Sequence, residues 1–148
     1  MTYIREATDT DRDNIVLLIN AAFRVESFFV DGDRTDSDKV SALFKSGKFL
    51  LIDDGSKLVG CIYVELRGAS GYFGLLSVDP PRQGQGVGGM LISDVLGRAD
   101  TERLPVYLET LKARNVPFYE KHGFVVREHF NCHGGRGPET WTMLREPR

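Results

Sequence analysis

Cysteine is scarce in this 148-residue sequence, which contains only Cys61 and Cys132. Small secreted domains that depend on disulfides are much richer in cysteine, and Cys61 lies in an apolar run typical of a strand. We therefore expect both thiols to be reduced packing residues of a cytoplasmic protein. Cys132 and His133, with His122 and His129 nearby, match no standard zinc spacing, so a solvated strand end is favoured over a metal site.

Long apolar runs and an excess of charge are absent too. No segment approaches the roughly 20 apolar residues of a membrane helix, and Met1–Glu6 lacks the apolar centre of a signal peptide. The net charge of −2 leaves no basic footprint for nucleic acid. A chain of this length can bury a sizeable core as one domain over residues 1–148. These absences favour a single domain that binds neither membranes nor nucleic acid.

Hydrophobic periodicity predicts the element order βααβββαβαββ. The first helix follows Thr8-x-x-Asp11, a variant capping box, and ends near Val25, and Ser37 is expected to cap the second helix. The expected strands cover residues 3–7, 48–52, 57–66, 72–78, 106–109, 124–131 and 140–144, and the later helices begin at Val87 and Asn115. This order predicts an α/β (α+β) fold with a mixed, mostly antiparallel central sheet of about six to seven strands, flanked by about four helices.

The most informative segment follows the strand 72–78, which Pro80-Pro81 ends because proline cannot donate to a sheet ladder. Four glycines then fall within six residues, at positions 84, 86, 88 and 89. They lead into a helix whose apolar stripe consists of Val87, Met90, Leu91, Val95 and Ala99. Glycine lets consecutive N–H groups converge on one anion, and the helix dipole also favours negative charge there. With Arg82 beside it, the segment predicts a phosphate site rather than a plain flexible turn.

Two other phosphate-binding loops can be compared with these residues. Gly84 to Gly89 satisfies GxGxxG, and Glu109 follows 20 residues after Gly89, so a dinucleotide fold stays formally open. However, that fingerprint follows its strand at once and opens a βαβ unit, whereas Gly84 lies six residues after Val78. A P-loop is excluded because no Gly-Lys-Ser or Gly-Lys-Thr is present.

Two segments together resemble the GCN5-related N-acetyltransferase (GNAT) family. Gln83-Gly84-Gln85-Gly86-Val87-Gly88 matches the family's acyl-CoA signature, Gln/Arg-x-x-Gly-x-Gly/Ala, letter for letter. The second segment combines Asn115 with Phe118-Tyr119-Glu120-Lys121-x-Gly123-Phe124, at the distance and in the order that the family has. The resemblance implies the GNAT acyl-CoA N-acyltransferase fold, acetyl-CoA as co-substrate, and transfer of its acetyl group to an amine.

The resemblance also assigns residues to the coenzyme. The pyrophosphate is expected on the N–H groups of Gln83, Gly84, Gln85, Gly86, Val87 and Gly88. The pantetheine arm is expected between two splayed strands, on the backbone of Leu76 and Val78, with the Leu76 N–H polarising the thioester carbonyl. Tyr119 matches the tyrosine that protonates the thiolate, and Asn115 matches a coenzyme contact. From the residues alone, Tyr119 can also be a packed aromatic, although the catalytic role is favoured, and Asn115 can equally be a helix N-cap, a role that it could have as well.

A general base is not obvious, because the strand positions where some relatives place histidine or glutamate hold Ser70, Tyr72 and Gly74. Glu109, at the end of the strand 106–109, is the residue that we assign as the base, with Glu26 and Glu65 as alternatives. Each of these can also be a solvated carboxylate without a catalytic role. An ordered water chain, or an amine that arrives already neutral, would make a dedicated base unnecessary.

The acceptor is expected in the segment that follows the first helix. It holds Glu26, Phe29, Asp31 and Arg34, whose carboxylates suit an amine and whose arginine suits a carboxylate. A solvated loop is the plainer interpretation of the same letters.

The function that these features favour is an acetyl-CoA-dependent N-acetyltransferase acting on a primary amine, on a small molecule or an exposed amino group, by direct transfer in a ternary complex. A non-catalytic acyl-CoA sensor is the main alternative, and a dinucleotide-binding oxidoreductase is a third. An exposed sheet edge at the C-terminal strands also suggests a possible homodimer.

Overall fold

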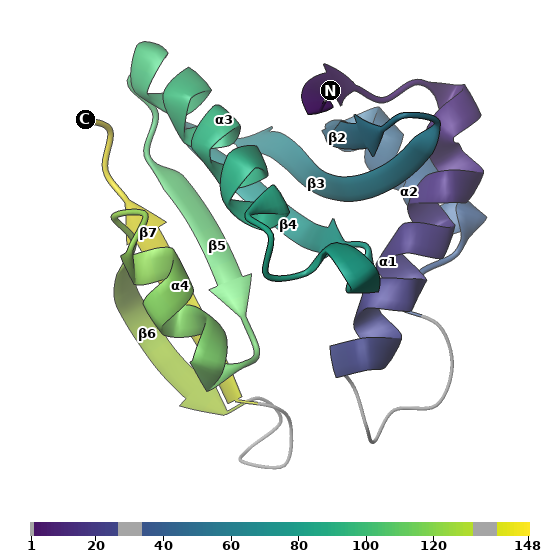
Figure 1. The fold of residues 1–148 in the computed structure, drawn as a ribbon. Helices are drawn as coiled ribbons and strands as arrows, with labels where there is room; N and C mark the ends of the chain where they lie inside the picture. The colour runs from purple at the N-terminus through teal and green to yellow at the C-terminus, as the bar shows by residue number, and fades with distance from the viewer. Residues whose placement is uncertain (1, 27–33, 132–138) are drawn as a thin grey trace. The chain divides into compact units, whose positions relative to one another are not determined.

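The computed structural model describes residues 2–26, 34–131 and 139–148. Its elements are β1 (Thr2–Glu6), α1 (Arg12–Glu26), α2 (Ser37–Ser46), β2 (Lys48–Asp54), β3 (Lys57–Arg67), β4 (Ser70–Val78), α3 (Val87–Thr101), β5 (Val106–Thr110), α4 (Val116–Glu120), β6 (Val125–Asn131) and β7 (Glu139–Arg145) (Figure 1). The strands form a seven-stranded sheet of order β1-β2-β3-β4-β5-β7-β6. Strands β4 and β5 are parallel, and the pairs β1/β2, β2/β3, β5/β7 and β6/β7 are antiparallel. The predicted order and the mixed, mostly antiparallel sheet are therefore confirmed.

The residues group into two compact units. The first unit comprises Met1–Glu65 and Leu75–Ile92, and the second comprises Leu66–Gly74 and Ser93–Arg148. The expectation of one domain over residues 1–148 stays a prediction.

In the first unit, β1, β2 and β3 form an antiparallel meander. Gly55 occupies the turn between β2 and β3 with φ +65°, a left-handed conformation that favours glycine. Helix α2 contacts both α1 and β2. The buried core draws on the helices and on both strands of the hairpin, with Ile15, Ile19, Val40, Phe49, Leu50, Leu51, Ile52, Cys61 and Ile62. Cys61 is a free, buried thiol, as expected, whereas Cys132 lies outside the described residues.

Helix starts in the first unit follow ordinary capping chemistry. The predicted capping box is present, because the Thr8 N–H donates to Asp11 Oδ2 at 2.8 Å. The second helix is capped by Asp36, whose side chain accepts from the Lys39 N–H at 2.9 Å, so the expectation of Ser37 as cap was wrong by one residue. Aspartate is at least as good an N-cap as serine, which explains the shift.

In the second unit, β5 pairs with β7, and β7 pairs with the edge strand β6. In the view of Figure 1, α4 is drawn in front of β6 and β7. Leu108 of β5 stands opposite Met143 of β7, and both are buried. Phe73 packs its ring against Phe124, with centroids 5.8 Å apart. Side chains alternate along a strand, so the neighbours of Leu108 and Met143 point to the opposite face of the sheet.

An ion pair joins β7 to the C-terminal part of α3. The buried Arg145 side chain donates two hydrogen bonds to Asp100, Nη1 to Oδ1 at 2.8 Å and Nη2 to Oδ2 at 3.0 Å. Its Nε also donates to the His122 carbonyl at 3.0 Å, and the Arg148 N–H donates to Asp100 at 3.0 Å. The guanidinium of Arg145, followed by the Arg148 N–H, lowers the pKa of Asp100 from 3.8 to about 2.

This ion pair predicts a defined acid dependence of stability. A carboxyl whose pKa is lowered by folding stabilises the native state above its unfolded pKa and loses that contribution as pH falls through its folded pKa. We expect the free energy of unfolding to fall between about pH 3.8 and about pH 2 in the wild type. In Asp100→Asn this part of the decline should be missing, as measured by urea unfolding at each pH. Parallel pH profiles of wild type and variant would contradict the assignment.

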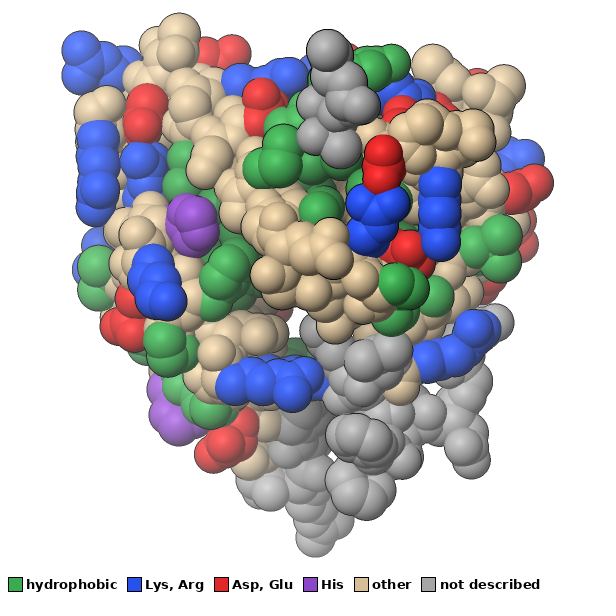
Figure 2. All heavy atoms as spheres, viewed as in Figure 1, with side chains coloured by type: hydrophobic (Ala, Val, Ile, Leu, Met, Phe, Trp, Pro, Cys, Tyr) green, Lys and Arg blue, Asp and Glu red, His purple; other side chains and the backbone are tan. Residues whose placement is uncertain are grey.

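Surface features of the described residues give two further observations. Among the described residues, no helix is long and apolar enough to cross a membrane. On the face shown in Figure 2, lysine and arginine side chains are interspersed with acidic and apolar ones.

Candidate functional site

The glycine loop is an open, exposed segment of the first unit at the start of α3. Gly84 and Gly86 have φ values of +80° and +84°, in the left-handed region that other residues rarely adopt. A Cβ at either position would have no heavy atom within 4 Å. The backbone angle, and not crowding, is therefore what requires glycine here.

The backbone N–H groups of the loop divide into bonded and unbonded sets. The Gln83 N–H donates to the Pro80 carbonyl at 3.3 Å, and helical bonding begins where the Met90 N–H donates to the Gly86 carbonyl at 3.0 Å. Within the described part of the chain, no backbone or side-chain acceptor takes the N–H groups of residues 84–89. Unbonded N–H groups at the positive end of a helix dipole form an anion site, so the loop fits a pyrophosphate.

Side chains beside the loop are bonded to neighbouring turns. Arg82 forms an ion pair with Asp54. Gln83 Nε2 donates to the Val78 carbonyl at 3.3 Å, and the Gln85 side chain donates to the preceding turn at the same distance. The Arg82 charge is thus paired with that of Asp54. The backbone N–H groups are therefore the main groups with which the loop can bind an anion.

The predicted buried stripe of α3 is largely observed. Val87, Leu91, Val95 and Ala99 are buried, but Met90 is 42% exposed. The prediction that Met90 belongs to the buried stripe was therefore wrong, because its position falls at the edge of the apolar face of the helix rather than within it.

Strand β4 is distorted just before the residues predicted to hold the thioester. Leu75 has φ +52°, a rare conformation for a residue with a Cβ. Its carbonyl accepts from Ser77 Oγ at 3.1 Å and from the Cys61 thiol at 3.8 Å. Burial raises the pKa of Cys61 to about 12, so this thiol packs rather than reacts. The distortion changes the backbone direction immediately before Leu76, and it was missed because Leu75 is an ordinary strand residue by type.

Tyr119 lies on α4 in an aromatic cluster of the second unit. It is 9% exposed, and its ring centroid lies 5.9 Å from Phe73, 5.3 Å from Phe118 and 6.1 Å from Phe124. The packing interpretation of the ring is therefore confirmed. The role of the hydroxyl as an acid stays a prediction.

Asn115 occupies the cap position of α4 without capping it. Its side chain makes no cap hydrogen bond, and Nδ2 is instead 3.4 Å from Thr110 Oγ1. The N-cap interpretation is thus wrong for the side chain, while the coenzyme contact stays a prediction. The predicted splaying of β4 from β5 also stays a prediction; the two strands pair at Gly71↔Val106 and Tyr72↔Tyr107.

Glu109 is exposed on β5 and has a close neighbour that sequence reasoning missed. Tyr107 donates its hydroxyl to Glu109 Oε1 at 2.5 Å. Burial, followed by the Glu109 carboxylate, raises the pKa of Tyr107 to about 12, so the phenol keeps its proton. The sequence could have predicted this pair, because residues two apart on a strand share a face of the sheet.

The residues predicted to bind the acceptor are only partly described. Glu26 ends α1 and Arg34 is exposed, whereas Phe29 and Asp31 lie outside the described residues. Next to Arg34, buried Thr35 pairs with Asn20 through two hydrogen bonds of 2.9 and 3.0 Å. This pair fixes the chain directly before α2.

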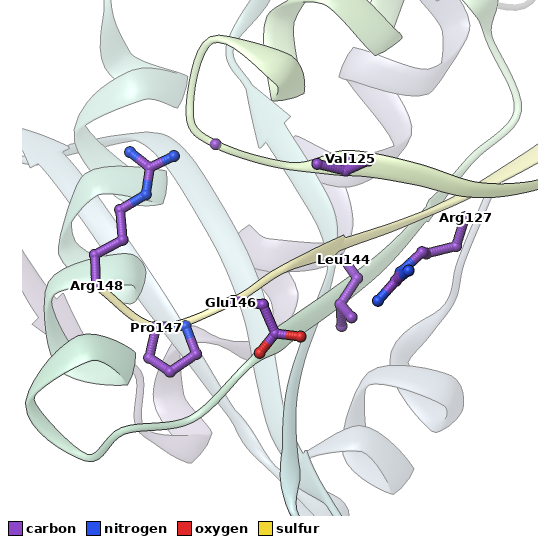
Figure 3. A pocket seen from close by; sticks show the side chains of 7 residues that line it. Val125, Arg127, Leu144, Glu146, Pro147 and Arg148 are labelled. Atoms are coloured by element: carbon purple, nitrogen blue, oxygen red, sulfur yellow. The ribbon is translucent and has the colours of Figure 1, made fainter.

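A pocket of about 310 Å³ lies on β6, β7 and the residues that flank them (Figure 3). Its lining residues are Gly123, Val125, Arg127, Leu144, Glu146, Pro147 and Arg148. None of the predicted site residues lines it. No group of three or more His, Cys, Asp or Glu residues that could hold a metal ion occurs in the described ranges.

A family model described as an acetyltransferase (GNAT) domain matches residues 45–126. The range covers more than half of the 148 residues and includes both the glycine loop and Tyr119. The chain belongs to the GNAT acetyltransferase family. Acetyltransferases of this family use acetyl-CoA.

A curated relative of this GNAT chain is an uncharacterised N-acetyltransferase of Schizosaccharomyces pombe. The two are 37% identical over 79 residues, which are 53% of this chain and 32% of the relative. The chain therefore spans about a third of that relative's length.

Solved structures share the GNAT fold over nearly the whole chain. Ribosomal-protein-S18-alanine N-acetyltransferase from Escherichia coli has a TM-score of 0.81 and 16% identity, covering 99% of this chain and 94% of that one. Ard1 from Thermoplasma volcanium has a TM-score of 0.79 and 20% identity, covering 99% of this chain and 98% of that one. An aminoglycoside 6′-N-acetyltransferase complexed with coenzyme A has a TM-score of 0.78 and 16% identity, covering 99% of this chain and 98% of that one. At these identities the likeness shows the fold, and it confirms the predicted fold class.

Proposed function

We propose that this GNAT chain is an N-acetyltransferase that moves an acetyl group from acetyl-CoA to a primary amine, on a small molecule or an exposed amino group. The observation that carries the proposal is the row of unbonded N–H groups over residues 84–89, held open by glycines at the start of α3. Nothing in the comparisons favours the alternative of a non-catalytic acyl-CoA sensor.

Direct transfer defines what the chain's residues must do. Acetyl-CoA supplies a thioester whose carbonyl carbon bonds to the acceptor nitrogen while its carbon–sulfur bond breaks. The loop amides hold the pyrophosphate, and the backbone of Leu76 and Val78 holds the pantetheine arm, with the Leu76 N–H donating to the carbonyl oxygen. The Tyr119 hydroxyl gives its proton to the departing sulfur, and Asn115 contacts the coenzyme. Glu109, or water in contact with it, takes the proton that the amine loses.

The finer expectations about the acceptor belong to this proposal as well. Glu26, Phe29, Asp31 and Arg34 are proposed to contact the acceptor. A cytoplasmic location accords with the free thiol of Cys61. A homodimer through the edge strand β6 accords with its place at the end of the sheet order. Membrane and nucleic-acid partners are not proposed.

The test is calorimetric titration with acetyl-CoA, with NAD as control, followed by measurement of free-thiol release across an amine panel. We expect acetyl-CoA to bind, NAD not to bind, and thiol to be released only when an amine is present. Binding without release on any amine would favour the sensor. Binding of NAD but not acetyl-CoA would favour the oxidoreductase.

A further inference from the structure

One face of the sheet in the second unit carries a cluster of polar and aromatic side chains outside the coenzyme residues. The strand registers place Tyr72 beside Tyr107 and Tyr107 opposite Leu144, so these three share a face. One step further along, Glu109 stands opposite Thr142 on the same face. This is the face opposite to that of Leu108 and Met143. Tyr72, Tyr107, Glu109, Thr142, Glu128 and Arg67 are called the tyrosine face below.

The two tyrosines lean along their strands in the same direction. Their ring centroids are 6.1 Å apart, and the Tyr107 hydroxyl reaches Glu109. A Cβ on Gly74 would lie only 2.6 Å from the Tyr72 hydroxyl, so the Tyr72 ring extends over Gly74. Because Gly74 has no side chain, it leaves room for the Tyr72 phenol.

On the same face, the hydroxyl of Thr142 lacks a hydrogen-bond partner in the part of the chain that the structure describes. Its side chain is buried at 6% exposure, and its Oγ1 has no hydrogen-bond partner among the described residues. Such a hydroxyl costs stability unless a partner arrives. It lies between two exposed carboxylates, because Glu109 of β5 and Glu128 of β6 both stand opposite it. A hydroxyl between two carboxylates suits an ammonium group, which donates three hydrogen bonds.

A cation lies at the other end of the tyrosine face. The guanidinium carbon of Arg67 is 3.5 Å from the centre of the Tyr72 ring, a stacked cation–π geometry. Arg67 also acts on Tyr107, opposing the rise in its pKa. A guanidinium recognises carboxylates through two parallel hydrogen bonds. The face therefore presents carboxylates and a hydroxyl at one end and a guanidinium at the other.

We propose that the tyrosine face binds the acceptor, and that the acceptor is a small amino acid-like zwitterion. Its amino group binds as an ammonium among Glu109, Thr142 and Glu128 and gives one proton to water before its nitrogen attacks the thioester. Its carboxylate bonds to Arg67, and its stem rests on the rings of Tyr72 and Tyr107. The inference rests on the proposed function, because it names the acceptor class of the same transferase, and it assigns the acceptor to this face in place of Glu26, Phe29, Asp31 and Arg34. It gives Glu109 a binding role that holds whether or not Glu109 also takes the proton.

The first test compares acids with their amides. Glycine, β-alanine and L-phenylalanine are each paired with the corresponding carboxamide, and kcat/KM is measured by thiol release from acetyl-CoA. We expect the wild type to prefer at least one acid over its amide, and Arg67→Gln to lower that ratio about tenfold, the effect of one charge-assisted pair of about 1.4 kcal/mol. Taking the ratio within each variant cancels the different basicity of the two amines.

Arg103→Gln is the matched control, since Arg103 is another exposed arginine of the second unit and lies between α3 and β5 rather than on the strands of the tyrosine face. It should leave the ratio unchanged. A wild type without preference for any acid, a ratio unaffected by Arg67→Gln, or a ratio lowered equally by Arg103→Gln would overturn the inference. If acetyl-CoA binds and other amines are acetylated, such results contradict this inference but leave the proposed function intact. If acetyl-CoA does not bind, the proposed function itself is contradicted.

Thr142→Val gives an independent test of the ammonium end. Valine replaces the hydroxyl with a methyl of similar size, so removing a hydroxyl without a partner should leave the melting temperature unchanged or raise it. The KM for the preferred acid should rise roughly tenfold while the acetyl-CoA Kd stays constant. A lower melting temperature with unchanged KM would show that Thr142 is purely structural and would remove it from the site.

Discussion

Gly86→Asp should weaken acetyl-CoA binding by roughly a hundredfold. Two unit charges 4 Å apart repel by about 4 kcal/mol at an effective dielectric constant of 20, and each 1.4 kcal/mol is a factor of ten. Solvent screening at an exposed loop reduces this repulsion, which leaves about 2 to 3 kcal/mol. The aspartate would stand directly beside the N–H groups of residues 84–89, where the pyrophosphate is proposed to bind. Calorimetric titration gives the Kd directly.

Backbone strain must be separated from charge, because Gly86 has φ +84°. Gly86→Asn has nearly the same shape, carries no charge, and asparagine tolerates left-handed angles better than most residues. Gly97→Asp adds the same carboxylate to an exposed position later in α3, with no heavy atom within 4 Å of its Cβ. We expect both to bind acetyl-CoA within a few-fold of wild type. An aspartate variant at position 86 that binds as tightly as the asparagine variant would exclude the loop from pyrophosphate binding.

The glycine loop shows how far local sequence determines a site. Gly84 and Gly86 were predictable because only glycine enters their backbone conformation without strain, and the N–H groups follow from the start of a helix. The element order was predictable for a related reason, since apolar periodicity records which face of each strand and helix is buried. Boundaries were less secure, as at Asp36, because adjacent residues compete for the same cap.

Contacts between strands were beyond prediction from the letters. The Tyr107–Glu109 pair is local to β5, but the place of Thr142 opposite Glu109 depends on the register of β5 against β7. Register depends on the buried pattern of both strands and shifts where a bulge occurs, as between Val126 and Glu128. The conformation of Leu75 is likewise set by its surroundings rather than by its type. Residues that depend on such pairings were therefore missed, while those on the signature segments could be proposed from the letters.

Tyr119→Phe should lower kcat by roughly 10²- to 10⁴-fold and leave acetyl-CoA affinity unchanged. The substitution keeps the ring, whose contacts with Phe73, Phe118 and Phe124 fix it in the core of the second unit. Only the hydroxyl is lost, and with it the proposed proton donor to the departing sulfur. Binding is measured by calorimetry and turnover by thiol release with the best amine of the panel.

The matched control is Tyr3→Phe, which removes the same hydroxyl from an exposed tyrosine on β1. It should retain full activity, and both variants should melt near the wild-type temperature. A Tyr119→Phe enzyme with wild-type kcat would restrict Tyr119 to packing. A variant that loses acetyl-CoA affinity in proportion to its activity would make the hydroxyl a coenzyme contact instead, since a group that acts only in the transition state lowers kcat and kcat/KM equally. Unchanged affinity with lost turnover is therefore the result that assigns the proton to Tyr119.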